Sequence, residues 1–481
     1  MTIRHLRAVL PVSILIFDIY SLTPKLMNCR FFSTLIIIFL INLSCQKFLD
    51  KVPDQSLTIP STLKDFDALL NNNYITQRNM SLGDLSCDDW YCTYSGYQSL
   101  PLLVRNCFIW QKDIFEGSTS SDWNAAYYAI YYANIVLENI GKISDDTTST
   151  AGHIAFDELK GRAFFIRAFS YYNLSQIFIV PYDSATATTD LGLPLRLHSD
   201  PNEKVARSSV RKTYEQMISD ALQAKDLLGT TVNENTPNVP SKSAAYALLS
   251  KIYLSMGSYQ DAGAYADSSL QLYSTLIDYN SLDTTKKLAF PIPTNNEVIY
   301  LALQGSYFSP FLRLVDSSLY RSYANGDLRK VIFFNTRNGG DDYYFRGSYT
   351  GTYTPFCGLA TDEMYLNRAE CYARAGDVTD AMADLNTLLK MRFQKGHFTN
   401  LIADNAEDAV RLILTERRKE LIFRNVRWSD LRRLNQDSRF AITLTRQLNG
   451  QTYTLPPNDP KYTFPIPPDE ISLGGVQQNK R

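Results

Sequence analysis

The chain has 481 residues, of which 45% are hydrophobic and 12% are aromatic, and its formal net charge is −1. This length allows a large buried core and exceeds that of one minimal domain. The absence of a basic surplus argues against a nucleic-acid-binding protein.

Residues 1–44 are predicted to form a signal peptide. The run Phe31–Leu43 is almost entirely apolar, is too short to span a bilayer comfortably and follows a short basic region. It leads into the sequence Leu-Ser-Cys, which resembles a bacterial lipobox, although Asn42 stands where leucine is common. Cys45 is therefore the predicted site of lipidation.

A second apolar run, Val9–Ile19, lies further upstream. A true start at Met27 would explain it. A plain transmembrane anchor is the competing interpretation of the N-terminal region. Because no later apolar run has spanning length, we expect the mature protein to be held at the membrane by its lipid alone.

A helix is predicted to start near Ser61 or Thr62, because apolar residues follow at helical spacing. Residues 71–118 are rich in Asn, Asp, Gly and Tyr and are predicted to form a long irregular stretch. Loops of this length in a folded domain are usually functional or disordered. The density of aromatic residues in this stretch argues against disorder.

Three further helices are predicted in the next part of the chain. One begins at Ser121, a second spans 156–178 and stops before Pro181, and a third spans 214–228. The segment 182–209 shows little periodicity.

An internal repeat follows these helices. The sequence AAYALLSKIYLSMGSYQDAGAYADSSL begins at Ala244, and the related sequence EMYLNRAECYARAGDVTDAMADLNTLL begins at Glu363. Both show the helix–turn–helix pattern of tetratricopeptide repeats, with glycine ending the first helix and small residues where paired helices approach. The insertion between them, at about 275–362, predicts loops and short strands, and such insertions often form the binding face.

The segment Thr415–Asn435 is predicted to be one helix that packs on more than one side. Arg424 falls in the same helical stripe as Leu421 and Trp428, which are predicted to be buried, so the charge of Arg424 must be paired. Glu420 lies four residues earlier and is the predicted partner. We interpret the charges of this segment as a structural ion-pair lattice, with an anion-binding or catalytic site as the alternative.

The same segment carries a family resemblance. The order Glu-Arg-Arg-x-Glu-Leu-x-Phe from Glu416, followed by Arg-Trp-x-Asp-Leu-Arg-Arg from Arg427, resembles the C-terminal signature of the SusD/RagB family. The leader FLDKVP after Cys45 and the segment Tyr462–Ile471 extend the likeness to the C-terminus. Members are lipid-anchored outer-membrane proteins that bind nutrients.

The resemblance implies a mainly α fold. We expect an interrupted tetratricopeptide-repeat helical scaffold with long loop insertions and little β structure. Residues 45–236 would form the SusD-like N-terminal region and residues 237–481 the C-terminal region, packed as one helical body.

Motifs for other chemistry are absent from the sequence. The histidines have no metal-ligand spacing, and there is no GxSxG or phosphate-loop motif, so we predict no cofactor and no metal centre. Asp88 and Asp89 lack an EF-hand pattern, so we favour solvated carboxylates over a calcium site. Cys87 and Cys92 either form a disulfide or are buried as thiols.

The resemblance also implies the function. The protein would capture an oligosaccharide at the cell surface, without catalysis, and deliver it to a SusC-like TonB-dependent transporter in the outer membrane. Capture of peptides or another nutrient is the alternative within the family. A glycoside hydrolase and a pure scaffold for protein partners are alternatives of other classes.

Two segments, Asp84–Tyr97 and Tyr307–Tyr353, are predicted to carry the ligand site, because they combine irregular backbone with aromatic and polar side chains. The alternative is that some of these aromatic residues only fix the loops to the core. The predicted stacking residues are Trp90, Tyr91, Tyr94, Tyr307, Tyr320 and Tyr343, and the predicted hydrogen-bonding residues are Asp88, Asp89, Asn325 and Arg346.

Overall fold

The computed structural model of the protein describes residues 60–72, 75, 79–143, 147–290, 295–307, 313–336 and 339–481. The predicted signal peptide and the predicted lipidation site, Cys45, lie outside these residues. Within the described part of the chain, no helix is both long and apolar enough to cross a membrane.

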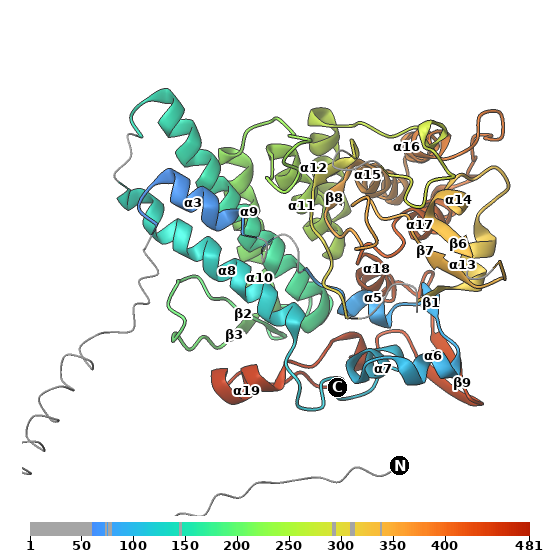
Figure 1. Ribbon diagram of the computed structural model, residues 1–481, viewed down its shortest axis with the longest axis horizontal. Coiled ribbons are helices and arrows are strands. Elements are labelled where there is room, and N and C mark those ends of the chain that lie inside the picture. Colours follow the sequence, from blue (N-terminus) through green and yellow to red (C-terminus); the bar gives the residue numbers. More distant parts are fainter. Residues whose placement is uncertain are drawn as a thin grey trace, which may run out of the picture. The chain divides into compact units, whose positions relative to one another are not determined.

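The described residues form a mainly helical fold with little strand, as predicted (Figure 1). The helices are α3 (Leu63–Leu70), α5 (Leu82–Ser86), α6 (Tyr94–Ser99), α7 (Leu102–Phe108), α8 (Ser121–Asn139), α9 (Thr150–Phe178), α10 (Val210–Leu227), α11 (Lys242–Ser255), α12 (Tyr259–Leu272), α13 (Ser317–Ser322), α14 (Arg329–Phe333), α15 (Thr361–Ala375), α16 (Val378–Lys390), α17 (Ala406–Glu420), α18 (Arg427–Leu434) and α19 (Pro468–Gly474).

The strands are short and form small antiparallel sheets. The strand β1 (Trp90–Tyr91) belongs to a four-stranded sheet of order β1-β5-β7-β6, with β5 (Leu314–Val315), β6 (Phe334–Thr336) and β7 (Tyr343–Phe345). The other sheets are the pairs β2 (Leu191–Pro194) with β3 (Arg207–Ser209), β4 (Val298–Tyr300) with β8 (Leu359–Ala360), and β9 (Leu444–Leu448) with β10 (Gln451–Leu455).

Local capping sets the starts of the predicted helices. The Thr62 hydroxyl accepts a hydrogen bond from the Asp65 N–H, and the Asp65 carboxylate bonds back to the Thr62 N–H, which forms a capping box at α3. The Ser120 hydroxyl caps α8 in the same way by accepting from the Trp123 N–H. These starts agree with the predicted ones, and α9 and α10 begin only a few residues before their predicted positions.

The long helices pack in succession. The helix α9 packs against α8 and α10, α11 packs against α10 and α12, and α15 packs against α12, α16 and α17 (Figure 1). The predicted repeat is confirmed, because its copies are the pairs α11–α12 and α15–α16. Gly376 ends α15 with φ of 89°, a conformation that favours glycine. Ala262 and Ala381 are fully buried, as the repeat pattern requires.

Residues 71–118 are more regular than predicted. They contain α5, α6, α7 and β1 rather than one long loop. These helices are five to seven residues long. The helical spacing of apolar residues can be recognised only over a longer helix, so the sequence did not predict these short helices.

The prediction of one helix across Thr415–Asn435 is wrong. The chain turns between α17 and α18, and Phe423 and Asn425 adopt φ of 54° and 56°. The Gln304 side chain donates to the Phe423 carbonyl, and the Asp84 carboxylate accepts the Asn425 N–H. The break is therefore held by residues far away in the sequence.

Packing around Trp428 agrees with its predicted burial. Its side chain is 1% exposed and contacts the rings of Tyr462 and Phe464, which belong to the C-terminal segment of the family resemblance.

Of the two states considered for Cys87 and Cys92, the structure shows buried thiols. The two residues form no disulfide.

Candidate ligand-binding site

The four-stranded sheet joins the two segments that the sequence predicts as ligand-binding. Tyr91 of β1 pairs with Leu314 of β5, and Leu314 pairs in turn with Tyr344 of β7. The Asp316 N–H before α13 donates to the Asp89 carbonyl at 2.8 Å, which fixes α13 to the β1 segment. Figure 1 shows β1, β6, β7 and α13 gathered on one side of the helical scaffold.

Three half-buried tyrosines of this region are called here the tyrosine platform: Tyr91 of β1, Tyr343 of β7 and Tyr320 of α13. The Tyr320 and Tyr343 rings stack with centroids 3.5 Å apart and planes 17° apart. The Tyr91 hydroxyl donates at 2.9 Å to the carboxylate of Asp342, the residue that precedes Tyr343 in the chain. The rings are thus fixed before any ligand arrives, which lowers the entropy that binding would cost.

Two polar groups at the platform were not among the predicted site residues. The Asp342 side chain is exposed, and the Lys330 ammonium lies 4.8 Å from the centroid of the Tyr320 ring. Burial, followed by its contact with Tyr343, raises the pKa of Tyr320, so its hydroxyl stays protonated at neutral pH. Asp342 could have been predicted as a site residue, because it precedes Tyr343 in an insertion.

Trp90 does not present its ring to solvent. Its side chain is 3% exposed, packs 4.6 Å from the Phe108 ring centroid and donates its indole N–H to the Asp84 carbonyl at 3.0 Å. Adjacent residues of a strand face opposite sides, so β1 buries Trp90 and leaves Tyr91 accessible. The structure thus corrects the predicted stacking role of Trp90, because its ring packs on the buried side of the sheet.

The carboxylates of Asp88 and Asp89 are occupied by arginines. Both Asp88 oxygens accept from Arg427, at 2.7 and 2.8 Å, and Asp89 accepts from Arg418 at 2.9 Å. Burial opposes ionisation, but Arg427 and Arg418 hold the pKa of Asp88 well below its usual value. These carboxylates are therefore structural rather than solvated, contrary to the sequence interpretation.

The other predicted residues fall into two groups. Arg346 is buried and donates to the carbonyls of two loop residues, Thr284 and Lys286, and of Val331 in α14, and the Tyr307 hydroxyl donates to the Asp122 carboxylate at 2.8 Å. Both residues fix loops, which is the alternative role considered above. Tyr94, 43% exposed at the start of α6, and Asn325, exposed in the turn before α14, remain accessible.

Charges near the signature segment form a buried lattice, as interpreted from the sequence. Arg392 and Arg329 both bind Glu420, at 2.7 and 3.0 Å, and each also binds a second carboxylate. The predicted Glu420–Arg424 pair is wrong, because the turn after α17 moves Arg424 to Asp362. We refer to this group, with Glu297 and Glu416, as the arginine–carboxylate lattice.

The lattice is built for ion pairs rather than for a bound cation. Oxygens of Glu297, Asp362 and Glu420 lie within 4.8 Å of one another. However, Arg392 bonds to both glutamates and Arg424 bonds to Asp362. The positive charges that these carboxylates need are thus already supplied by the protein.

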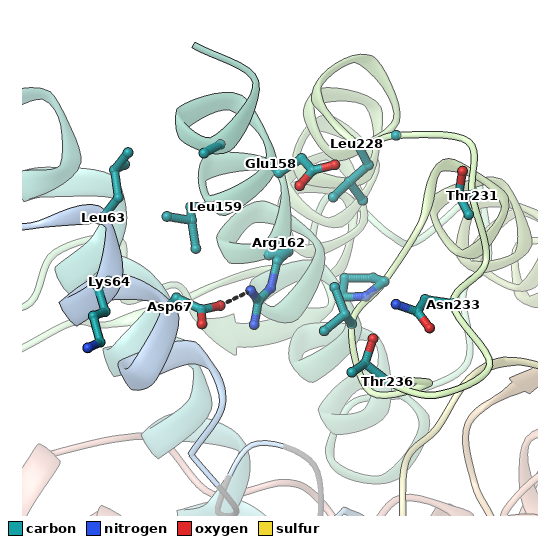
Figure 2. Close-up of a pocket in the computed structure, with 14 residues that line it drawn as sticks. Leu63, Lys64, Asp67, Glu158, Leu159, Arg162, Leu228, Thr231, Asn233 and Thr236 are labelled. Atoms are coloured by element: carbon teal, nitrogen blue, oxygen red, sulfur yellow. Dashed lines mark hydrogen bonds and ion pairs between the residues drawn. The ribbon is translucent and has the colours of Figure 1, made fainter. Parts of the chain in front are cut away.

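A separate hollow of about 560 Å³ lies between α3, α9 and the 228–240 connection (Figure 2). Asp67 and Arg162 form an ion pair of 2.5 Å in its wall, and Thr231, Asn233 and Thr236 face them from the connection. No aromatic ring is found among its described lining residues. The hollow therefore lacks a surface on which a ring could stack.

Comparison with known proteins identifies the family. A family model described as starch-binding associating with outer membrane matches residues 47–254, and a model of the SusD family matches residues 346–480. The chain belongs to the SusD/RagB family. Similarity to SusD-like protein P2 of Formosa agariphila extends over 382 residues at 25% identity, covering 66% of this chain and 72% of that protein.

Solved SusD structures share the fold of this family member. A putative sugar binding protein from Bacteroides vulgatus superposes with a TM-score of 0.69 at 21% identity, covering 87% of this chain and 98% of that one. A laminarin-binding SusD-like protein gives a TM-score of 0.62 at 18% identity, covering 87% and 99%. The predicted tetratricopeptide-type helical scaffold is thereby confirmed.

Proposed function

We propose that this SusD/RagB protein is a lipid-anchored, surface-exposed protein of the outer membrane that binds glycans and performs no catalysis. It captures oligosaccharides at the tyrosine platform and delivers them to a SusC-like TonB-dependent transporter. The observation that carries the proposal is the platform itself. It joins two distant segments, because Tyr91 bonds to Asp342, which lies 251 residues later in the chain.

The chemistry of the platform suits a sugar. Pyranose rings have apolar C–H faces that pack against aromatic faces, and their hydroxyls need donors and acceptors at the rim. Tyr343, held in place by Tyr320, offers a ring, and the exposed Asp342 offers acceptor oxygens. Asn325 and Lys330 supply donors from the neighbouring α13–α14 region.

The comparisons favour carbohydrate over peptide or another nutrient. One matched family model is described as starch-binding, and two similar structures carry descriptions of sugar or laminarin binding. We further propose that the regions 45–236 and 237–481 act as one body. This joining of the two regions is supported by α11, which begins at Lys242 and packs against α10 and α9 of the first region.

A binding and turnover assay tests the ligand class. The full chain is titrated with maltooligosaccharides, laminarioligosaccharides and a casein peptide mixture by calorimetry, and each mixture is then analysed by chromatography. We expect a glycan to bind and to be recovered unchanged. New reducing ends would instead identify a glycoside hydrolase, and binding of peptides alone would identify the other nutrient class.

Membrane attachment and transport are tested separately. We expect Cys45→Ala to leave a folded protein in the soluble fraction, whereas the unsubstituted chain stays with the outer membrane. Recovery of Cys45→Ala in the membrane fraction, with its signal peptide removed, would contradict the lipid anchor. Capture of the anchored protein from detergent-solubilised outer membranes should co-purify a TonB-dependent transporter, and its absence would contradict the delivery role.

A further inference from the structure

A second cleft, of about 520 Å³, lies along α8 and shares no residue with the tyrosine platform. It is bordered by residues 196–201, which follow β2, and by α19. Figure 1 shows α8 and α19 well separated from β6, β7 and α13. A volume between about 300 and 1,000 Å³ is typical of sites for small molecules.

One wall of this α8 cleft is aromatic. Trp123, Tyr127 and Tyr131 follow one another at steps of four residues and so lie along one side of α8. The Trp123 and Tyr127 rings are 4.8 Å apart, and the Tyr127 hydroxyl donates to the Pro194 carbonyl at 2.9 Å, which fixes its ring. Tyr128 adds a ring that is 55% exposed at the rim.

The opposite end of the cleft is polar. Glu470 of α19 accepts from the Trp123 indole N–H and from the Arg196 guanidinium, each at 3.4 Å, which is long for a hydrogen bond. The side chains of Arg196 and Glu470 keep 24% and 19% of their surface exposed. An acceptor and a donor therefore stand side by side within reach of a ligand, and their charges compensate each other.

We propose that the α8 cleft is a second carbohydrate-binding site, which takes one or two neutral sugar units. The tyrosine rings stack on the apolar face of a pyranose, and adjacent hydroxyls bond to Glu470 and Arg196 together. Because the two charges cancel, the site selects a neutral polyol over an anionic sugar. This proposal rests on the proposed glycan-binding function. The hollow in Figure 2 differs from the α8 cleft, because no aromatic residue lines it.

A background in which platform binding is weakened tests the α8 cleft. The full chain carrying Tyr343→Ala is titrated with maltohexaose and laminarihexaose and followed by saturation-transfer NMR. We expect residual binding in this background, and we expect Tyr128→Ala or Glu470→Gln added to it to weaken that binding about tenfold, by analogy with stacking on other ring ligands. Tyr128→Phe, which keeps the ring, should retain it.

Control variants separate site effects from folding. Thr231→Ala changes only the hollow of Figure 2, and Tyr265→Ala removes a half-buried tyrosine that stacks on Tyr253 in the scaffold; neither should alter sugar binding. Each variant's thermal unfolding is recorded beside its titration.

The possible outcomes are distinct. If Tyr343→Ala abolishes all binding, the second site is overturned while the proposed function stands. If neither glycan binds the unsubstituted chain, both proposals fail for these glycans. If the α8 variants impair only co-purification with the transporter, the cleft is a protein contact and the inference is wrong.

Discussion

The tyrosine platform and the arginine–carboxylate lattice both bring together charged residues from distant parts of the chain, but they differ in access to water. Arg329 and Arg392 are fully buried, and each binds two or more carboxylates inside the protein. The platform tyrosines are only half-buried, and Asp342, which accepts from Tyr91, is exposed. The lattice pairs its charged groups within the protein, whereas the platform leaves polar groups that a ligand could contact.

This difference shows why composition alone does not identify a site. A buried charge carries a large desolvation cost, so each member of the lattice depends on its partners for stability. An exposed ring or carboxylate can be removed and replaced by water at little cost to folding. Substitutions in the lattice should therefore change stability, and substitutions on the platform should change binding.

The largest effect is expected from Arg392→Met. This change leaves Glu297 and Glu420 without one of their cations and should destabilise the fold by about 3–5 kcal/mol. Urea unfolding measures the difference. Arg411→Met is the matched control, because Arg411 is exposed and its ion pair with Glu407 and its bond to the Arg439 carbonyl lie at the surface, so its loss should hardly matter. Equal stability of both variants would show that the lattice is not required for the fold.

Trp428→Ala should also destabilise by about 3–5 kcal/mol, because it empties a buried site between Tyr462 and Phe464. Glycan affinity measured below the unfolding temperature should be unchanged. A stable variant with lost binding would mean that the signature segment contacts ligand, and the distinction between the two regions would fail.

The pH dependence of stability offers a third test. Burial opposes ionisation of Glu370, but Arg433 and Arg374 lower its pKa from 4.5 to about 2. The folded-state pKa lies below the unfolded one, so this stabilisation is complete above about pH 4.5 and is lost as the pH falls toward 2, by about 3 kcal/mol in all. The gap in unfolding free energy between the unsubstituted chain and Glu370→Gln should therefore narrow between pH 5 and pH 3. A constant gap would contradict the assignment.

The smallest effect on folding is expected on the platform. Tyr343→Ala should weaken glycan binding by about 1–3 kcal/mol, the range seen for aromatic stacking on other ring ligands, while thermal unfolding stays close to that of the unsubstituted chain. Calorimetry with the bound oligosaccharide measures it. Tyr265→Ala, which breaks a stacked pair in the helical scaffold, is the control and should bind normally. Unchanged affinity in Tyr343→Ala would place the ligand elsewhere.

The sequence by itself determined the features that depend on nearby residues. Helix starts at Thr62 and Ser120 follow from side chains that bond to the backbone three residues later. The repeat at α11–α12 and α15–α16 follows from apolar spacing and from Gly376, and the signature after Glu416 indicates the family. The segments proposed to carry the ligand site could also be singled out, because their tyrosines lie in insertions between scaffold helices.

Only the tertiary structure decided which residues of the proposed site are accessible to solvent and which partners the charges take. Tyr91 rather than Trp90 is accessible because β1 pairs with β5, whose residues come over 200 positions later. The turn at Phe423 and Asn425 depends on Gln304 and Asp84. This turn places Arg424 where it forms an ion pair with Asp362. Such contacts leave no local pattern, because their energy arises only when remote segments are brought together and water is excluded.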